Sequence, residues 1–526
     1  MPPFLRNFLK HSNAPVLLLI IFNLLVGAFT FRDYGLTLDE PLYYQYADAL
    51  GYAYSPGEWF SGNFDLENSF GPSGSDHQNR GPAYLLLARE PARLLQNALG
   101  MDYPSAWHLI NFISFQFGVY FFFVFSRRWM KNWAAFAATL FFATQPLLWG
   151  HAFINPKDPP FLAAFLISLE LGFRMADRIA NPQANEKTWM TFTHILFPAL
   201  VLGFATNLRV LGPLAGLLAF VYFLFLRKPA RSFWFIPYGL IALVTLFVTW
   251  PFLWQAPIQN LFEVLYFFSD NPTELRLLFR GEIYTADNLP LRYLPTLLAI
   301  TLTEPVWPLA IAGFFISIRR WQLKTIEWKT LLPVLLWFII PLIYVFIRRP
   351  AMYDSFRHSL YILPPVFVLA GIALDAIFRR VSMPYIKITL IGLLILPAIW
   401  ADIQLHPYQY TYYNQFVGGT GEASYNYETD YWSTCYKDAA QEFASIVTDT
   451  PTLYVGGKGI DNLRYYANRN FVVEDYLPRR HDYTGKYVLS SSRANNRLPF
   501  FNGLYDKETI RVERDNAIFC VIRKIK

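Results

Sequence analysis

Three carboxylates stand next to apolar segments of the chain and suit acid–base chemistry. Asp39 and Glu40 follow the apolar run 14–31, and Asp158 lies directly before Pro159 at the start of another apolar run. A carboxylate close to hydrocarbon is costly unless it is hydrated, paired or functional. At a membrane surface such a group can take the proton from an attacking hydroxyl. Asp39, Glu40 and Asp158 are therefore candidate catalytic residues.

Basic side chains near the same predicted surface suit the binding of a phosphate. The candidates are Arg80, Lys157, Arg209, Arg357 and His358. Guanidinium groups form charge-assisted, bidentate hydrogen bonds with phosphate oxygens, and they stabilise the charge of a departing phosphate. Acids and arginines together therefore fit the transfer of a sugar from a lipid-linked phosphate to an acceptor hydroxyl. In-line attack on the anomeric carbon would invert its configuration.

Membrane-spanning helices must position these residues. Hydrophobic residues make up 54% of the chain and aromatic residues 18%, which is typical of a polytopic membrane protein and not of a soluble enzyme. The net charge of +7 does not indicate nucleic acid, because the sequence has no basic face or binding motif of that kind. Apolar runs of about 17–25 residues predict about eleven spans, near 14–31, 105–126, 131–149, 159–176, 190–207, 210–226, 233–254, 294–318, 330–348, 357–377 and 384–402.

The distribution of Lys and Arg predicts the orientation of these spans. The segments before the first span and after each even-numbered span are basic, so we expect them on the cytoplasmic side. The N-terminus is then cytoplasmic, and the candidate acids and cations lie together outside. Arg348, Arg349 and Arg357 break the rule because they also stand outside. Snorkelling side chains at a helix end would explain them, and an anion site is the functional alternative.

The regions outside the spans have their own predicted structure. The segments 39–50 and 82–99 read as amphipathic interfacial helices, 51–80 as a loop, and 255–292 as a loop long enough to cover an acceptor site. The spans stop at residue 402, and 403–526 suits a small extracytoplasmic α/β domain. Its strands are predicted near 452–456, 471–474, 487–490 and 518–522, with a helix near 462–467. In an oxidising compartment Cys435 and Cys520 can pair as a disulfide.

The motifs resemble those of the C superfamily of membrane glycosyltransferases (GT-C), especially the branch of protein O-mannosyltransferases and lipid A aminoarabinose transferases. The most specific element is Asp39-Glu40 after the first span. Weaker matches follow in the order of the family: Arg80 before Pro82, Asp158 before Pro159, Arg209 before Gly212-Pro213, and Arg357 with Tyr361 and Pro364. The resemblance covers about residues 1–400. The segment 51–80 and the C-terminal domain lie outside it.

The resemblance implies a helical GT-C-like bundle and a role for each candidate. Asp39 would be the general base, Glu40 would orient it or bind the acceptor, and Asp158 would hold basic side chains or touch the sugar. The donor phosphate would be bound by Arg80, Arg209 and Arg357, with Lys157 and His358 beside them. No cofactor is implied, although Asp39 and Asp158 could together hold a divalent metal.

The resemblance also implies the partners and the compartment. The donor would be a polyprenyl-phosphate monosaccharide, and the acceptor a lipid-linked glycan, a surface polysaccharide or a protein. We expect a bacterial plasma membrane, because the chain has no Asn-x-Ser/Thr site in which x is not Pro. The sequence identifies neither the sugar nor the acceptor.

Other interpretations stay open for single residues and for the whole chain. Asp39 and Asp158 can each cap the helix that follows, and Glu304 before Pro305 can mark a broken helix. A secondary transporter or lipid flippase of polyprenyl-linked substrates is the main alternative function. Such proteins usually have paired inverted repeats with helices broken at mid-membrane, and the sequence shows no such pairing. A non-catalytic subunit that kept the fold is a third possibility.

Overall fold

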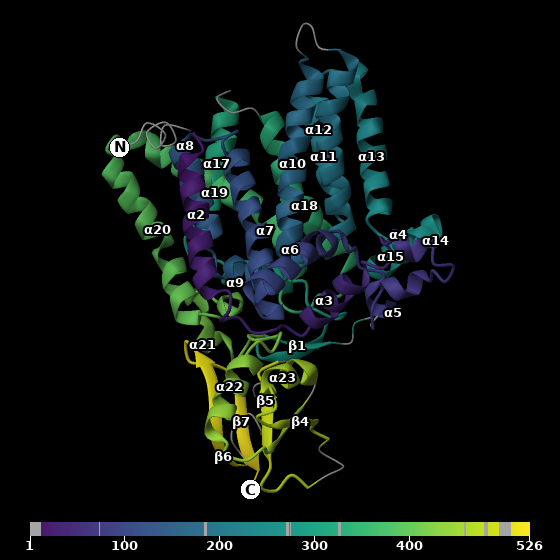
Figure 1. Ribbon diagram of the computed structural model, residues 1–526. Coiled ribbons are helices and arrows are strands. Elements are labelled where there is room, and N and C mark those ends of the chain that lie inside the picture. The colour runs from purple at the N-terminus through teal and green to yellow at the C-terminus, as the bar shows by residue number, and fades with distance from the viewer. Residues whose placement is uncertain are drawn as a thin grey trace.

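The computed structural model contains a helical bundle with a smaller sheet domain below its lower end (Figure 1). The described residues are 12–72, 74–182, 187–269, 273, 275–323, 328–456, 459–477, 482–493 and 506–525. All candidate site residues fall within these ranges.

Long apolar helices form the bundle at the positions where spans are predicted. Six stretches of helix in the described chain are long and apolar enough to cross a membrane. They are α7 (Tyr103–Ser126), α10 (Asp158–Ala180), α11 (Thr188–Leu208), η2 (Pro229–Trp234) with α13 (Phe235–Val248), α18 (Trp328–Arg348) and α20 (Pro384–Leu405). Shorter helices complete the bundle: α2 (Ala14–Thr30), α8 (Asn132–Ala143), α12 (Pro213–Phe225), α17 (Val306–Gln322) and α19 (Pro364–Arg380).

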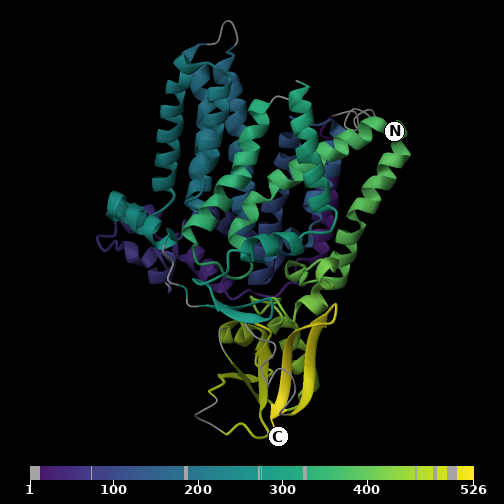
Figure 2. The same ribbon diagram turned by 180° about the vertical axis from the view of Figure 1, so that it is seen from behind.

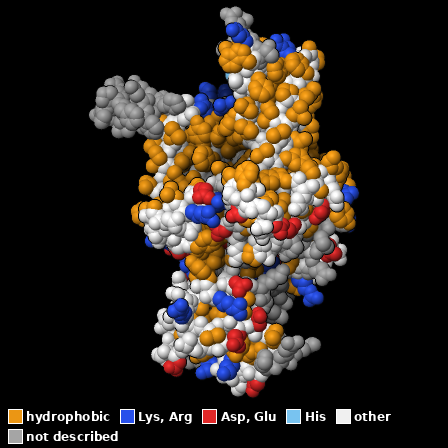
Figure 3. Space-filling view, turned by 45° about the vertical axis from the view of Figure 1, so that its right-hand side comes forward, with side chains coloured by type: hydrophobic (Ala, Val, Ile, Leu, Met, Phe, Trp, Pro, Cys, Tyr) orange, Lys and Arg blue, Asp and Glu red, His pale blue; other side chains and the backbone are white. Residues whose placement is uncertain are grey.

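The surface of the bundle is apolar. Hydrophobic side chains cover it in Figure 3, whereas acidic side chains gather at its lower end and on the domain below. Phe29, Val244 and Ile347 are among the large apolar side chains that the bundle exposes. An exposed apolar belt of this extent fits contact with lipid and not with water. The protein is therefore an integral membrane protein, as its composition predicts.

Among the predicted spans that are interrupted, two bind each other at their breaks. The span 131–149 is divided into α8 and α9 (Pro146–Ile154), and the span 294–318 into α16 (Tyr293–Ile300) and α17. Gln145 in the first break accepts a hydrogen bond from the backbone N–H of Thr303 in the second, at 3.1 Å. Its Nε2 also donates to Thr303 Oγ1 at 3.0 Å. Helix breaks free backbone groups that need partners away from water, so this pairing explains why both are tolerated.

Glu304 lies in the second break and not inside a helix. Its carboxylate accepts a hydrogen bond from the backbone N–H of Gln415 at 2.8 Å. Asn414 donates to the carbonyl oxygens of Ala299 and Leu302, both at 2.9 Å. The segment after α20 thus satisfies the end of α16, and the contacts of Glu304 are structural.

Short helices and a hairpin close the lower end of the bundle (Figures 1 and 2). The two predicted interfacial helices are α3 (Glu40–Ala49) and α6 (Ala83–Leu99). The segment between them is not only a loop, because it contains α4 (Pro56–Trp59), η1 (Leu66–Ser69) and α5 (Gly74–His77). The predicted span 233–254 ends in the short helix α14 (Phe252–Gln255). The predicted covering segment 255–292 holds α15 (Pro257–Ser269) and the antiparallel strands β1 (Arg276–Phe279) and β2 (Glu282–Thr285).

The C-terminal domain is built on a five-stranded sheet of order β4-β3-β5-β7-β6. Strand β3 runs parallel to β4 and β5, and β7 runs antiparallel to β5 and β6. Strand β6 escaped prediction because charged residues outnumber apolar ones in it. Cys435 and Cys520, whose pairing the sequence leaves open, form a buried disulfide. The elements are α21 (Gly419–Ala423), α22 (Tyr436–Ile446), β3 (Thr452–Val455), α23 (Ile460–Ala467), β4 (Val472–Asp475), β5 (Tyr487–Ser491), β6 (Asp506–Arg514) and β7 (Ala517–Ile525).

The domain is docked onto the segment that leads from α2 to Asp39. The backbone N–H of Leu36 donates to Tyr466 of α23 at 2.8 Å, and Asn462 Nδ2 donates to the carbonyl of Thr37 at 2.8 Å. Lys437 of α22 donates to the carbonyl of Arg32. These bonds fix the short connection before α3, so the domain helps to place the first candidate acid.

Candidate active site

The candidate residues come from four separate connections at the lower end of the bundle. Asp39 precedes α3, Asp158 is the first residue of α10, Arg209 follows α11, and Arg357 begins the short helix η3 (Arg357–Ile362). Each connection joins helices whose ends lie at the lower end of the bundle. Residues more than 300 positions apart in the chain therefore become neighbours.

Arg357 is the centre of the site. Its Nη2 donates to Asp39 Oδ2 at 3.2 Å and to Asp354 Oδ2 at 3.1 Å, and its Nη1 lies 3.3 Å from Asp158 Oδ2. The guanidinium also lies over the ring of Trp432, 4.9 Å from the centroid. Both predicted aspartates thus meet the predicted late arginine in one cluster.

The carboxylate of Asp158 is fixed by hydrogen bonds from three side chains. It accepts a hydrogen bond from Arg209 as well as from Arg357, and Asn155 Nδ2 donates to its Oδ2 at 2.8 Å. Its side chain is only 2% exposed. Lys157, and not Asp158, occupies the cap position of α10. The carboxylate therefore serves the two arginines and does not cap the helix.

Asp39 is the carboxylate of the cluster that a substrate can reach. Its side chain is 31% exposed, compared with 5% for Asp354. It stands at the cap position of α3 but makes no side-chain capping bond. Instead it turns one oxygen toward Arg357, while Oδ1 has no hydrogen-bond partner within the described ranges. This exposed, half-occupied carboxylate is the group best placed to accept a proton.

Lys157 and Arg80 make no ion pair with any of the residues that the structure describes. Lys157 is buried, and its Nζ lies over the rings of Tyr43 and Phe268 at 5.7 and 5.6 Å. Burial and the neighbouring Arg209 and Arg80 hold the pKa of Lys157 well below its usual value. Repulsion of this kind is relieved when an anion binds.

The guanidinium groups likewise offer unused donors. Arg80 donates to Tyr43 Oη at 2.8 Å. The Nε–H groups of Arg209 and Arg357 are buried and have no acceptor in the part of the chain that the structure describes. A buried donor without an acceptor is costly, so these groups fit a site that a ligand completes.

Glu40 and His358 lie outside this network. Glu40 accepts hydrogen bonds from the Thr37 backbone N–H at 2.6 Å and from Tyr44, and its carboxylate lies 2.9 Å from His108 Nε2. All these contacts hold the start of α3, and none reaches Arg357. His358 packs edge-on against Tyr353, 4.9 Å between ring centroids. Both predicted residues therefore border the cluster without joining it.

Four residues of the site escaped sequence reasoning: Tyr353, Asp354, Trp432 and Arg493. Asp354 accepts from Arg357, from Trp432 Nε1 at 3.1 Å and from Arg493 at 3.2 Å. A signal for it existed, because it lies three residues before Arg357. It also adopts φ of 54°, followed by Ser355 with φ of 60°, a rare conformation without glycine that often marks functional sites. Trp432 and Arg493 belong to the C-terminal part of the chain, and only tertiary packing brings them here.

No open metal site is visible in the described residues. The one group there with metal-ligand spacing is Asp430 with Cys435 and Cys520. The two sulfurs are joined to each other, and Asp430 accepts hydrogen bonds from Tyr410 and from the Thr434 and Cys435 backbone. Between Asp39 and Asp158, the guanidinium of Arg357 lies where a shared cation would have to bind.

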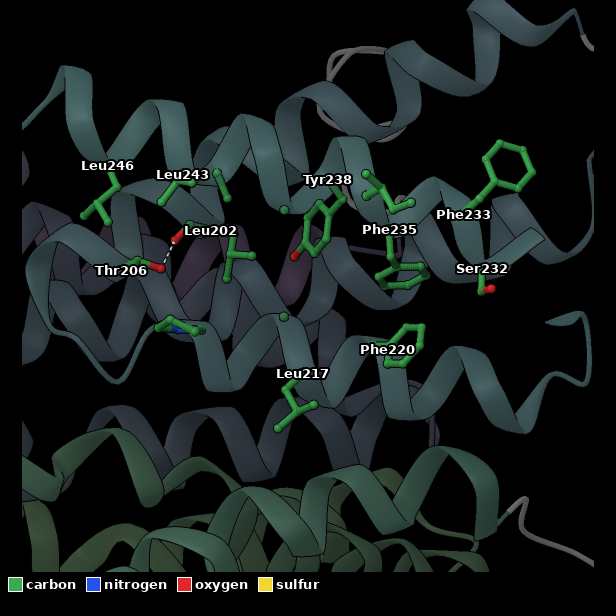
Figure 4. Close-up of a pocket in the computed structure, with 15 residues that line it drawn as sticks. Leu202, Thr206, Leu217, Phe220, Ser232, Phe233, Phe235, Tyr238, Leu243 and Leu246 are labelled. Atoms are coloured by element: carbon green, nitrogen blue, oxygen red, sulfur yellow. Dashed lines mark hydrogen bonds between the residues drawn. The ribbon is translucent and has the colours of Figure 1, made fainter. Parts of the chain in front are cut away.

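An apolar groove lies between α11, α12 and α13. It measures about 710 Å³. Figure 4 shows it running from Thr206 and Leu246 at one end to Ser232 and Phe233 at the other, past Leu217 and Tyr238. Thr206 is three residues before Arg209 in the chain. One end of the groove is therefore formed by the last turns of α11, the helix that Arg209 follows.

Solved structures of two membrane glycosyltransferases are similar to this chain. ArnT from Cupriavidus metallidurans is 15% identical in its apo state and 14% identical when bound to undecaprenyl phosphate; each match covers 96% of this chain and 97% of ArnT at a TM-score of 0.48. The oligosaccharyltransferase from Archaeoglobus fulgidus, tethered to an acceptor peptide, is 12% identical over 94% of this chain and 72% of its own, at a TM-score of 0.49.

Both proteins belong to the GT-C superfamily, which the sequence motifs resemble. No protein-family model matches the sequence, and no curated protein matches it either. Structural similarity at these identities and TM-scores identifies no functional residue in this chain.

Replacement of Asp158 should lower the stability of the protein more than replacement of Asp39, because Asp158 is buried and Asp39 is partly exposed. Asp158→Asn leaves Arg209 without its buried counter-charge and removes one of the two buried carboxylates that bind Arg357, so we expect a loss of about 3–5 kcal/mol in the free energy of unfolding. Asp39→Asn should change stability little, because its carboxylate is partly hydrated. Thermal unfolding of both purified variants in one detergent measures the difference. Equal midpoints would contradict the buried network.

A second prediction concerns Glu428, which is buried beside the cluster. Burial raises its pKa to about 8, with Arg493 lowering it and Asp354 raising it. The native state then retains a proton that the unfolded chain releases near pH 4.5, so stability falls as the pH rises from 4.5 to 8. Glu428→Gln removes this loss: its unfolding midpoint should match the parent at pH 5 and exceed it at pH 8.5. A parallel pH dependence in both proteins would contradict the burial of an ionisable group.

Proposed function

We propose that the protein is an inverting glycosyltransferase that moves a monosaccharide from a polyprenyl-phosphate donor to an acceptor hydroxyl. One observation carries this proposal: Arg357 joins Asp39 and Asp158 beside Lys157 and Arg80, which make no ion pair within the described residues, and an apolar groove ends at Thr206, three residues before Arg209 in the chain. A polyprenyl-phosphate sugar offers a sugar, a phosphate and a long apolar chain in that order. The site supplies a complementary surface for each part.

The charges favour a phosphate. The basic residues of the site are Arg80, Lys157, Arg209, Arg357 and Arg493, and the acids that they face are Asp39, Asp158 and Asp354. Cations are therefore in excess when the site is empty of substrate. Arg80, Lys157 and Arg209 are the residues that would hold the phosphate, and the Nε–H groups of Arg209 and Arg357 provide the free donors.

Asp39 is the general base in this proposal. The acceptor hydroxyl gives its proton to Asp39 Oδ1 while its oxygen bonds to the anomeric carbon. The bond from that carbon to the phosphate oxygen breaks, and polyprenyl phosphate leaves with the electron pair. Arg357 lies between Asp39 and Asp158, so it stabilises both the base and the negative charge of the leaving group.

The groove between α11, α12 and α13 would receive the isoprenoid chain. Its lining is almost wholly apolar, and its end at Thr206 lies close to Arg209 in the chain. Polyprenyl phosphates are also the lipids bound in solved structures of the two similar proteins. ArnT binds undecaprenyl phosphate, and AglB, the oligosaccharyltransferase from Archaeoglobus fulgidus, binds a dolichol-phosphate. For this chain we propose undecaprenyl phosphate as the carrier.

We place the reaction on the extracytoplasmic side of a bacterial plasma membrane. The buried disulfide Cys435–Cys520 supports this, because such bonds persist in oxidising compartments. The C-terminal domain and the cluster lie at the same end of the bundle (Figure 1). We further propose that no metal takes part, since Arg357 provides the positive charge between the two carboxylates.

The decisive experiment incubates purified protein with a panel of radiolabelled polyprenyl-phosphate sugars and measures released polyprenyl phosphate. Asp39→Asn should turn over one donor about 10²–10⁴-fold more slowly than the parent, and EDTA should leave the parent rate unchanged. Asp48→Asn, which removes an exposed acid of α3 outside the cluster, is the matched control and should keep the parent rate. Equal turnover by Asp39→Asn and the parent would remove Asp39 as the base. Transport of the intact donor across a vesicle membrane, without release of polyprenyl phosphate, would favour the flippase alternative.

The groove makes a separate prediction. Leu243→Trp places bulk into it, and the loss of burial for about two methylene groups, at about 0.8 kcal/mol each, raises the KM for a long-chain donor about 15-fold. A donor with a short chain should be used as well as by the parent. Leu240→Trp lies on the same helix outside the groove and is the control. An equal effect of Leu243→Trp on both donors would show that the chain binds elsewhere.

A further inference from the structure

A segment of the C-terminal part of the chain contacts the residues of the proposed catalytic cluster. Tyr431 belongs to the stretch between α21 and α22, and its hydroxyl lies 2.9 Å from Nε2 of His151 on α9. Both side chains are buried. The backbone carbonyl of Tyr431 accepts a hydrogen bond from Arg493, and the neighbouring Trp432 packs on Arg357. Tyr431 is therefore held firmly against the bundle.

The orientation of Asn155 follows from its backbone contacts. Its Oδ1 accepts hydrogen bonds from the backbone N–H groups of Lys157 at 3.0 Å and Asp158 at 2.9 Å. The amide nitrogen must then face the other way. There it meets Asp158 Oδ2 at 2.8 Å and His151 Nδ1 at 3.3 Å. An amide nitrogen only donates, so both of these atoms are acceptors.

The protonation state of His151 follows from that of its neighbour. Because Nδ1 accepts from Asn155, it carries no hydrogen, and the ring proton of the neutral imidazole lies on Nε2. Nε2–H then donates to the oxygen of Tyr431. Hydrogen bonds of fixed direction thus run from the C-terminal part of the chain to the buried acid of the site: Tyr431, His151, Asn155 and Asp158.

We propose that Tyr431 is a positioning residue for the glycosyl transfer described above. Its hydroxyl oxygen is the acceptor that keeps His151 in the Nε2–H tautomer. That tautomer presents Nδ1 as an acceptor, which keeps the Asn155 amide pointed at Asp158. Asp158 in turn sets the positions of Arg209 and Arg357, and hence the place of the donor phosphate. This inference rests on the proposed function only for the identity of the phosphate ligand.

The hydrogen bonds that run from Tyr431 through His151 and Asn155 to Asp158 form a relay. This relay explains why a domain outside the membrane should affect chemistry inside the bundle. When the Tyr431 oxygen is removed, a buried Nε2–H loses its acceptor, which favours the other tautomer. Nδ1–H would then face the Asn155 amide donor, and Asn155 would have to rotate away from Asp158. Displacements of about 1 Å in a positioning contact can reduce a rate about 100-fold.

The test uses Tyr431→Phe, which keeps the ring and removes the hydroxyl. Isothermal titration with farnesyl phosphate measures binding without turnover, and we expect about 10-fold weaker affinity. Solid-state NMR of lipid-embedded protein labelled with ¹⁵N-histidine should show an unprotonated Nδ1 at His151 in the parent and a protonated population in the variant. Loss of the signal in His151→Gln assigns it. Tyr408→Phe removes another buried hydroxyl, bonded to Asp438 at 2.8 Å, and should change neither measurement.

The possible outcomes separate the relay from the proposed reaction. Unchanged affinity together with an unchanged tautomer in Tyr431→Phe would overturn the relay. Weaker affinity with a lower unfolding temperature and an unchanged tautomer would also overturn it, because the hydroxyl would then be merely structural. If the parent binds farnesyl phosphate but transfers no sugar, the proposed reaction fails while the binding and NMR results still decide the role of Tyr431.

Discussion

The burial of Arg357 is the constraint on which the site depends. A guanidinium cannot lose its hydration unless carboxylates surround it. Here three aspartates from three connections supply them, at 3.1 to 3.3 Å. Asp39, Asp158 and Asp354 can meet at one point only if α3, α10 and η3 all begin at the same end of the bundle. The charge of Arg357 thus links three connections that are far apart in the chain.

The same arrangement prepares the site for chemistry before substrate arrives. Arg209 and Arg357 are held in place by Asp158, so little reorganisation is needed when a phosphate binds. Within the described residues the Nε–H groups of Arg209 and Arg357 have no acceptor and Lys157 makes no ion pair, which leaves attraction for an anion. Of the three aspartates, Asp39 alone keeps contact with solvent, and this difference in exposure separates the proposed base from the two buried acids.

The C-terminal domain is part of this site and not an attachment to it. Trp432 covers Arg357, Arg493 binds Asp354, and Tyr431 reaches His151 inside the bundle. The disulfide at Cys435 ties the segment that carries Tyr431 and Trp432 to strand β7. The folded domain thus supplies part of the polar wall of the site.

The sequence alone determined the features that depend on composition and order. Apolar runs located the helices of the bundle, and the acids and arginines at their ends identified Asp39, Asp158, Arg80, Arg209 and Arg357 as candidates. These positions could be predicted because a charged group at the end of a membrane span costs free energy unless it is paired, hydrated or functional.

Tertiary structure decided which of these residues meet and which do not. Glu40 stands next to Asp39 in sequence, yet the first turn of α3 directs it to His108 and away from Arg357. Gln145 and Thr303 break two runs that hydropathy reads as continuous, since each satisfies the other across the bundle. Trp432, Arg493 and Tyr431 carry no local mark of function, because their roles arise from contacts between segments far apart in the chain. Side-chain direction and long-range packing are physical properties of the folded chain, and no local pattern of residues contains them.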